Sequence, residues 1–205
     1  RNLDAFPFVN RATELRRRET DAIVRKALND NNSEKTNIIE LEKALPITKQ
    51  LLVEQRLISQ QHAESKGPRS VAISNDRLLS IMINEEDHLR MQSIIPGHNL
   101  EIPFKRLKEL DQELSKKIPF AYDEKLGFLT ACPTNIGTGI RCSSMLHLPA
   151  LRITGEIERV ERAARDLDLV IRGPYGEGSQ HHGDLYQISN QLTLGFSEEK
   201  ILKKF

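Results

Sequence analysis

Residues 71–90 read VAISNDRLLSIMINEEDHLR and carry the clearest structural signal in the chain. Two apolar runs, at 71–73 and 78–83, flank the turn-rich tetrapeptide Ser74-Asn75-Asp76-Arg77. This pattern predicts an antiparallel hairpin. The acidic triplet Glu85-Glu86-Asp87 follows the second run directly. We therefore expect it at the end of a strand, where three carboxylates need a cationic partner.

Helical and extended segments are predicted upstream of this hairpin. A helix is expected over residues 12–28, with its arginines in solvent and with one apolar face made of Leu15, Ile23, Val24, Ala27 and Leu28. Residues 37–41 predict a weak strand. Proline at position 46 is typical of the first turn of a helix, which we expect to run to about Ile58. Residues 60–69 are predicted to form a polar loop.

Downstream of the hairpin, the pattern predicts more helices and strands. One helix begins near Pro103 and is expected on one face of a sheet, because apolar residues recur three and four apart at Leu107, Leu110, Leu114 and Ile118. Strands are predicted at 126–131, 140–148, 168–172, 184–188 and 190–195. A helix at 155–167 would present Ile157, Val160, Ala164 and Leu167 on one side. Together these elements predict an α+β fold, a mostly antiparallel sheet flanked by helices, in a single domain over residues 1–205.

The composition excludes some classes of function. The chain contains 30 Lys or Arg and 29 Asp or Glu, so no overall field favours a nucleic-acid or membrane partner. No apolar run approaches the roughly 20 residues of a membrane span. The first residues lack the apolar segment of a secretory signal, so we expect a cytoplasmic protein. Cys132 and Cys142 are too few for a disulfide framework and are expected to be free thiols.

Three later stretches add to the acidic triplet. They are CPTNIGTGIR at 132–141, HLPAL at 147–151 and RGPYGEGS at 172–179. Together the motifs resemble the ATP:guanidino phosphotransferases over nearly the whole chain, most closely the bacterial enzymes that phosphorylate arginine side chains of proteins. The resemblance implies the phosphagen kinase catalytic fold, which is glutamine synthetase-like. It also implies transfer of the γ-phosphoryl group of ATP, with Mg²⁺, to a guanidinium.

A guanidinium is a difficult nucleophile. Its pKa exceeds about 12, so it must be oriented and lose a proton, and a carboxylate can serve both needs. The resemblance identifies Glu86 and Glu177 as these carboxylates. It also places Cys132 beside the guanidinium, where a thiolate would help to hold the cation. Without the family, the acidic triplet is more often a solvated turn, Glu177 an acidic loop residue and Cys132 a small buried residue.

The transferred phosphoryl group requires fixed cations, because negative charge spreads over its oxygens in the transition state. No Walker-type sequence occurs, and the resemblance instead identifies Arg90, Arg141 and Arg172, each of which alone could be a surface arginine. The resemblance also assigns nucleotide contacts to Cys142, Ser143, Ser144, Met145, Gly173, Pro174, Tyr175, Gly176 and Glu177. Taken by itself, Cys142 is better interpreted as a packing residue. Mg²⁺ is inferred from triphosphate chemistry, since the sequence has no ligand motif.

Other features leave two interpretations open. The tripeptide Gly137-Thr138-Gly139 is either a turn or a means of bringing backbone amides to phosphate oxygens. His88 either steers its neighbouring carboxylates or the nucleotide, or is a satisfied structural histidine. His181 and His182 are expected to be exposed loop residues rather than metal ligands. Residues 173–183 contain four glycines and are expected to form a mobile lid.

The sequence also departs from the family pattern. The Ser-Ser-Arg-x-Arg-like strand of the family is missing before Arg1-Asn2. Arg56 stands where the family usually has a nucleotide-contacting histidine, and the chain stops at Phe205. We therefore expect a fragment that is nearly inactive by itself.

Two alternatives to protein-arginine phosphorylation stay open. One is a phosphagen kinase acting on free arginine or another small guanidino compound. The other is a catalytically dead binder of arginine-phosphorylated proteins. The resemblance implies as partners protein substrates with exposed arginine, a zinc-binding activator protein and a Clp-type protease system, and it leaves homodimerisation open.

Overall fold

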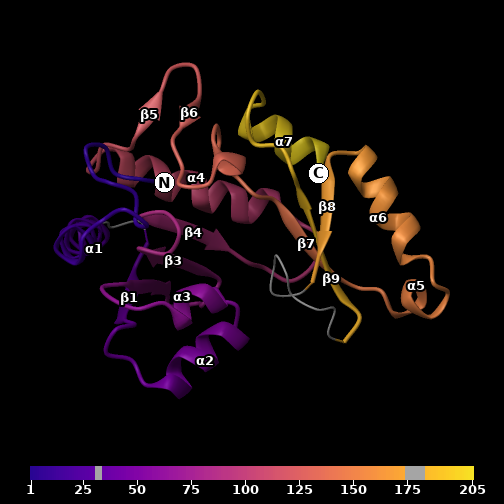
Figure 1. Ribbon diagram of the computed structural model, residues 1–205, viewed down its shortest axis with the longest axis horizontal. Helices are drawn as coiled ribbons and strands as arrows, with labels where there is room; N and C mark the ends of the chain where they lie inside the picture. The colour runs from indigo at the N-terminus through magenta and orange to yellow at the C-terminus, as the bar shows by residue number, and fades with distance from the viewer. Residues whose placement is uncertain (31–33, 174–182) are drawn as a thin grey trace. The chain divides into compact units, whose positions relative to one another are not determined.

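The computed structural model describes residues 1–30, 34–173 and 183–205. The chain divides into two compact units, Arg1–Pro133 and Thr134–Phe205, whose helices and strands are labelled in Figure 1. Every strand pair within the described residues is antiparallel and helices accompany the sheets, which confirms the α+β class. A single catalytic domain over residues 1–205 stays a prediction, since two compact units can belong to one domain.

The first unit is built on a four-stranded sheet in the order β1-β2-β3-β4. Its strands are β1 (Thr36–Glu40), β2 (Ser70–Ser74), β3 (Leu79–Ile83) and β4 (Leu89–Ser93). The predicted hairpin is confirmed as β2 and β3, with Ala72 opposite Ile81. The sequence analysis did not predict β4, an edge strand. Because only its alternate residues Leu89 and Met91 face the apolar core, it lacks a continuous apolar run.

Helices α1 (Glu14–Asn29) and α4 (Glu101–Ser115) pack on one face of this sheet. Both predictions are confirmed, and Thr13 caps α1 by accepting a hydrogen bond from the Arg16 N–H. The buried core comprises Val24, Ala27 and Leu28 of α1, Leu110 and Leu114 of α4, Ile118, and Ala72, Leu79, Ile81 and Ile83 of the strands. The predicted apolar face of α1 was wrong at Leu15 and Ile23, which are 67% and 38% exposed.

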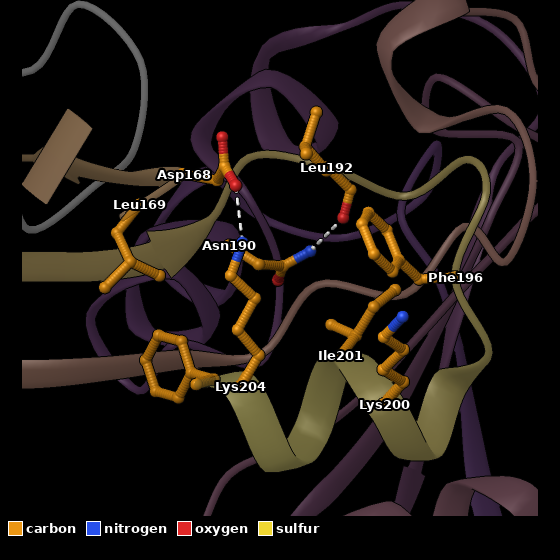
Figure 2. Close-up of a pocket in the computed structure, with 9 residues that line it drawn as sticks. Asp168, Leu169, Asn190, Leu192, Phe196, Lys200, Ile201 and Lys204 are labelled. Atoms are coloured by element: carbon orange, nitrogen blue, oxygen red, sulfur yellow. Dashed lines mark hydrogen bonds and ion pairs between the residues drawn. The ribbon is translucent and has the colours of Figure 1, made fainter. Parts of the chain in front are cut away.

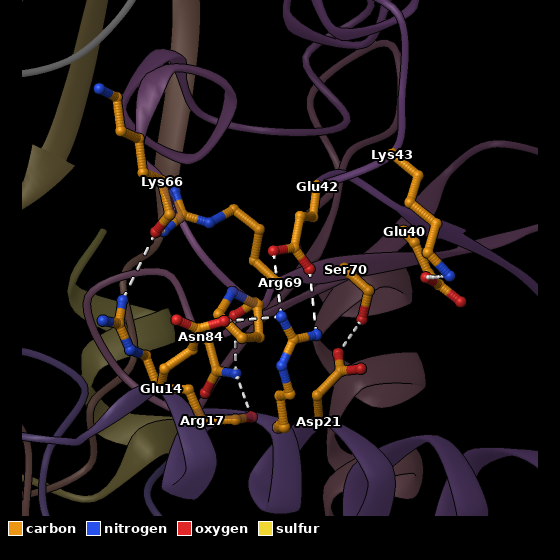
Figure 3. A network of polar contacts seen from close by, with 12 residues as sticks. Glu14, Arg17, Asp21, Glu40, Glu42, Lys43, Lys66, Arg69, Ser70 and Asn84 are labelled. Carbon is orange, nitrogen blue, oxygen red and sulfur yellow. Dashed lines mark hydrogen bonds and ion pairs between the residues drawn. The ribbon is translucent and has the colours of Figure 1, made fainter.

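Polar side chains also form part of the contact between α1 and strands β1 and β2. Asp21 is buried, accepts a hydrogen bond from Ser70 and forms an ion pair with Arg25. Figure 3 shows Asp21 facing Ser70, with Glu40 and Lys43 beside them. Arg25 also contacts Glu40, so part of the arginine-rich surface of α1 is tied to β1 rather than simply solvated.

The opposite face of the sheet is covered by α2 (Pro46–Glu54) and α3 (Gln60–Glu64). This second core contains Leu41, Leu52, Leu57, Ile58, Val71, Ile73 and Met82. Helix α2 ends before the predicted Ile58, because Arg56 adopts a left-handed φ of 58° and the Leu57 N–H bonds back to the Leu52 carbonyl. The polar loop predicted at 60–69 was wrong over α3, which begins at the N-cap Ser59 and buries His62.

The second unit contains a three-stranded antiparallel sheet in the order β7-β9-β8. Its strands are β7 (Ser143–His147), β8 (Leu169–Arg172) and β9 (Leu185–Asn190), and its helices are α5 (Pro149–Ile153), α6 (Ile157–Asp166) and α7 (Glu198–Lys204). The predicted helix at 155–167 is confirmed as α6. Leu167 was assigned to its apolar side wrongly, since this residue is 61% exposed.

The strand predicted at 190–195 was wrong, because the chain turns after Asn190. The Asn190 side-chain amide donates to the carbonyls of Ile140 and Leu192, and Figure 2 shows the second of these bonds. A side chain that binds the backbone two residues ahead favours a turn over a continued strand. Helix α7 follows, with Ile201 buried and Lys204 paired with Asp168.

Two smaller elements complete the description. The strand predicted at 126–131 is reduced to β6 (Gly127–Phe128), which pairs with β5 (Tyr122–Asp123). Pro133–Asn135 form a short 3₁₀ turn. None of the helices in the described parts of the chain is long and apolar enough to cross a bilayer.

Candidate active site

The acidic triplet lies in the loop between β3 and β4, residues 84–88. Asn84 has a left-handed φ of 59°, which asparagine tolerates better than most residues. Its side chain donates to the Arg17 carbonyl at 2.8 Å and the Pro68 carbonyl at 3.1 Å, as Figure 3 shows for Arg17. The Asn84 N–H bonds to the His88 carbonyl at 3.0 Å and closes the loop. The backbone around the triplet is therefore fixed by neighbouring segments.

The three carboxylates of this loop have different surroundings. Glu85 is 9% exposed and accepts hydrogen bonds from the Ser59 hydroxyl at 2.6 Å, Arg90 Nη1 at 2.9 Å and the Glu86 N–H at 2.8 Å. Burial raises the pKa of Glu85, but the Arg90 charge and these hydrogen bonds outweigh burial and hold it below its usual value. Asp87 is buried too, whereas Glu86 is exposed. Glu86 is thus the exposed carboxylate of the three.

Asp87 joins the acidic loop to the segment that leads to Cys132. Its Oδ1 accepts from Asn2 Nδ2 and from the Ala131 N–H, both at 2.7 Å. Asn2 also donates to the Leu129 carbonyl at 3.0 Å. Cys132 itself is partly exposed and its carbonyl accepts from the Thr130 hydroxyl. Within the first unit, the structure therefore brings together the segments that carry Glu86 and Cys132.

His88 is a structural histidine. Its Nδ1 accepts from the Leu3 N–H and its Nε2 donates to the Pro7 carbonyl, both at 3.0 Å. Both ring nitrogens are used by the fold, and burial lowers the pKa of the ring, so the neutral form is favoured. The second of the two interpretations of His88 is the correct one.

In the second unit, strand register places several predicted nucleotide contacts on one face of the sheet. Residues paired across an antiparallel sheet point to the same face, and side chains alternate along each strand. Met145 and Arg172 both pair with Gln187, and Ser143 pairs with Ser189. Gln187 donates to the Ser143 hydroxyl, and Arg172 donates to the Ser189 hydroxyl, each at 3.0 Å. This polar face combines an arginine with hydroxyl and amide groups.

Other predicted contacts do not share that face. Ser144 pairs with Ile188, so its side chain points to the opposite side from Ser143 and Met145. Cys142 is 6% exposed, and burial raises the pKa of its thiol to about 11. These surroundings support the interpretation of the Cys142 side chain as packing.

Gly137 has a structural explanation. Its φ is 108°, and a Cβ atom there would lie 2.6 Å from the Thr193 carbonyl oxygen and 2.9 Å from Leu194 Cα. The Thr138 N–H also bonds to the Thr193 carbonyl, at 3.1 Å. A close approach of two backbone segments therefore requires glycine at this position, which favours the turn interpretation.

The remaining predictions about the site are not tested. Pro174, Tyr175, Gly176, Glu177 and the histidines at 181 and 182 lie outside the described residues, as does most of the predicted lid. Arg90 is in the first unit, and Arg141 and Arg172 are in the second. Their convergence on one nucleotide stays a prediction. Over the ranges 1–30, 34–173 and 183–205, no group of His, Cys, Asp or Glu is arranged to hold a metal ion.

Sequence reasoning missed Ser59 and Asn2, the residues that hold the acidic loop. Ser59 accepts from the His62 N–H as the N-cap of α3 while donating to Glu85. A serine followed by a helix is a recognisable cap signal. No local signal links Asn2 to the loop, because its partners are 85 and 127 residues away in the chain.

Comparisons with known proteins agree with the motifs. The family model described as ATP:guanido phosphotransferase, C-terminal catalytic domain, matches residues 19–205. The protein-arginine kinase of Halothermothrix orenii is 44% identical over 98% of this chain and 58% of its own length. The protein-arginine kinase of Caldanaerobacter subterraneus is 43% identical over 99% of this chain and 61% of its own length. The chain thus spans about three fifths of these relatives.

Solved structures confirm the predicted fold. The duplicated taurocyamine kinase from Schistosoma mansoni, with bound transition state analogue components, has a TM-score of 0.92 and 25% identity. It is matched over all of this chain and 30% of that one. Lombricine kinase has a TM-score of 0.85 and 26% identity, over all of this chain and 60% of that one.

Proposed function

The chain belongs to the ATP:guanido phosphotransferase family. On this basis we propose that it is part of the catalytic region of a protein-arginine kinase. The reaction is transfer of the γ-phosphoryl group of MgATP to the guanidinium of arginine residues in proteins. The observation that carries the proposal is the acidic loop, which buries Glu85 and Asp87 and exposes Glu86. The name shared by the curated relatives supports a protein substrate.

The acceptor half of the reaction needs carboxylates. Glu86 pairs with the planar guanidinium, orients it and takes the proton that leaves nitrogen as the N–P bond forms. Glu177 is the second carboxylate in the proposal. The exposed position of Glu86 suits this role, because a ligand can reach its side chain, whereas Glu85 beside it is buried. Cys132 is proposed to lie beside the bound guanidinium and to help hold it.

The donor half needs positive charge. Arg90, Arg141 and Arg172 are proposed to bind the phosphates of ATP, with Arg172 on the polar face of the β7-β9-β8 sheet. Such fixed cations stabilise the charge on the transferred group. Mg²⁺ bound with the nucleotide would supply further neutralisation of the phosphate charge. The described residues offer no cluster of protein ligands, so we propose that the ion is held chiefly by the triphosphate and water.

The likeness to taurocyamine and lombricine kinases favours a second candidate, a phosphagen kinase acting on a small guanidino compound. The relatives named protein-arginine kinase are more similar in sequence, at 43% and 44% against 25% and 26% identity. The protein substrate is therefore the preferred proposal.

Product analysis distinguishes these functions. The longest reading frame that contains this chain is incubated with γ-labelled ATP and Mg²⁺, with an arginine-rich protein or with free arginine as acceptor. We expect an acid-labile, base-stable label on the protein and little on free arginine. Label on free arginine alone would establish the phosphagen kinase. Binding of an arginine-phosphorylated protein without transfer to either acceptor would establish the catalytically dead binder.

Partners and location belong to the same proposal. We propose a cytoplasmic enzyme whose protein substrates expose arginine, working with a zinc-binding activator protein and a Clp-type protease. Co-purification of such proteins with the tagged full-length enzyme tests this part. Size-exclusion chromatography with light scattering tests whether the enzyme is also a homodimer.

A further inference from the structure

The amide side chain of Asn2 occupies the junction between the acidic loop and the segment before Cys132. Asn2 is 1% exposed. Its Oδ1 accepts from the His88 N–H at 2.9 Å, and its Nδ2 donates to Asp87 Oδ1 at 2.7 Å and to the Leu129 carbonyl at 3.0 Å. Both N–H groups of the amide donate, and its oxygen accepts one hydrogen bond.

These bonds form a closed ring of contacts that joins the Asn2 side chain, the Asp87 side chain and the backbone of residues 129–131. Asp87 Oδ1 receives the Ala131 N–H at 2.7 Å in addition to Asn2, and Asn2 returns to the same segment through Leu129. An amide is the side chain of this size that can accept from one backbone N–H while donating to a carboxylate and a carbonyl. An aspartate at position 2 would have no donor and would face the Asp87 carboxylate. The ring is therefore specific to the pair of side chains present.

The backbone of residues 2 and 3 is held from outside the ring. The Asn2 carbonyl accepts from the Ala121 N–H at 2.9 Å, and the Leu3 N–H donates to His88 Nδ1 at 3.0 Å. The position of Asn2 is thus fixed by hydrogen bonds to its own backbone and to that of Leu3. The residues on both sides of Glu86 are also restrained, Glu85 by Ser59 and Asp87 by Asn2.

We propose that Asn2 is a positioning residue that sets the acidic loop of Glu86 against the segment that carries Cys132. The inference rests on the proposed function, in which Glu86 and Cys132 both act on the guanidinium. Asn2 acts through Asp87 and the backbone of residues 88, 129 and 131, and it does not itself touch the substrate. Loss of its amide lets the two segments move apart, which reduces the productive geometry for proton removal.

A swap of the two side chains tests the proposal without requiring kinase activity. Asn2→Asp removes both donors and places two carboxylates together. In the double variant Asn2→Asp with Asp87→Asn, the amide introduced at position 87 donates to the carboxylate introduced at position 2, and its oxygen still accepts the Ala131 N–H. Asn37→Asp is the control, because the Asn37 amide contacts the exposed Asn75 side chain, away from the ring. Where Asn2→Asp does not fold, Asn2→Ala replaces it, since this change introduces no repulsion.

Two measurements report the geometry directly in each folded variant. One is the rate of alkylation of the partly exposed Cys132 at a fixed pH, with the buried Cys142 as an internal reference. The other is amide hydrogen exchange at His88 and Ala131. For Asn2→Asp we expect exchange at both amides to rise about tenfold and the rate of Cys132 alkylation to change. The two bonds that Asn2 Nδ2 donates, to Asp87 and to the Leu129 carbonyl, are lost and two carboxylates repel each other, so the segments that carry these groups loosen. The swap should restore both measurements toward those of the unchanged chain.

The outcomes separate the inference from the proposed function. In the full-length enzyme, Asn2→Asp should lower kcat for phosphoarginine formation with little change in KM for ATP, and the swap should recover part of kcat. Unchanged exchange, Cys132 alkylation rate and kcat in Asn2→Asp would overturn the positioning role. If exchange and the Cys132 alkylation rate respond and are rescued, but the unchanged enzyme forms no phosphoarginine, the positioning geometry is supported and the proposed function fails.

Discussion

The acidic loop of the first unit and the β7-β9-β8 sheet of the second hold their candidate site residues in different ways. The loop depends on single polar side chains from distant segments, such as Ser59 on Glu85 and Asn2 on Asp87. The sheet places Met145 and Arg172 on one face by register, through pairing with Gln187, and Arg172 also donates to the neighbouring Ser189 hydroxyl. A loop of this kind should be sensitive to one substitution, whereas the sheet face should lose only the function of the residue replaced.

The largest expected effect is at Asp87. Asp87→Ala leaves the Asn2 amide and the Ala131 N–H buried without their acceptor. We expect the free energy of unfolding of the first unit to fall by about 3 kcal/mol, because each unsatisfied buried donor costs about 1–3 kcal/mol. Urea denaturation measures this change. Glu109→Ala, on the exposed side of α4, is the control with an expected change below about 0.5 kcal/mol.

Arg172 should show the opposite behaviour. Arg172→Gln removes a charge from the sheet face but leaves the β8 and β9 backbone pairing intact. We expect ATP affinity to fall by about 1.5–3 kcal/mol, the usual range for a hydrogen bond to a charged group, with little change in unfolding. Isothermal titration measures the affinity. A large loss of stability with unchanged affinity would contradict the assignment of Arg172 to the donor phosphates.

Ser59 separates the capping contribution from the loop contribution. Ser59→Ala removes both the α3 cap and the bond to Glu85, and should cost about 2 kcal/mol. Ser197→Ala is a matched control, since Ser197 caps α7 through Lys200. Its loss should cost about 1 kcal/mol. Equal costs in the two variants would show that the Glu85 bond does not stabilise the loop.

The smallest predicted effect concerns pH. Hydrogen bonds to Lys43 and Arg25 lower the pKa of Glu40 from 4.5 to about 2. A depressed folded-state pKa contributes stability that is present above the unfolded value of about 4.5 and is lost as pH falls toward 2. Glu40→Gln should flatten the stability of the first unit over this range. Because the Glu40 side chain is 36% exposed, solvent screening keeps the effect small.

The predictable parts of the fold were those fixed by local pattern. The β2–β3 hairpin and helices α1, α4 and α6 follow from alternation, turn residues and helical spacing. Helix α3 and the turn after Asn190 were missed because their signals are side-chain bonds to nearby backbone, from Ser59 and Asn190, rather than a periodic pattern of apolar residues. Burial of Leu57 and Ile58 ends α2 early, and the Asn190 amide bends the chain back to Leu192.

In the candidate site too, some features could be predicted from the sequence and others only from the structure. The sequence motifs selected Glu86 by resemblance, but the physical difference between Glu86 and its two acidic neighbours depends on Ser59, Arg90 and Asn2. Of these three residues, Arg90 alone is close in sequence. Contacts between residues far apart in the sequence form only in the folded chain, so no spacing rule could have predicted that Ser59 and Asn2 bond to the acidic loop.

The role of Glu86 is tested most directly by phosphoarginine formation in Glu86→Gln of the full-length enzyme, compared with Glu109→Gln. The proposal predicts that Glu86→Gln lowers kcat about 10²–10⁴-fold, the contribution expected of a general base, while ATP still binds. Glu109→Gln should retain full activity. Undiminished phosphoarginine formation by Glu86→Gln would contradict the proposed mechanism.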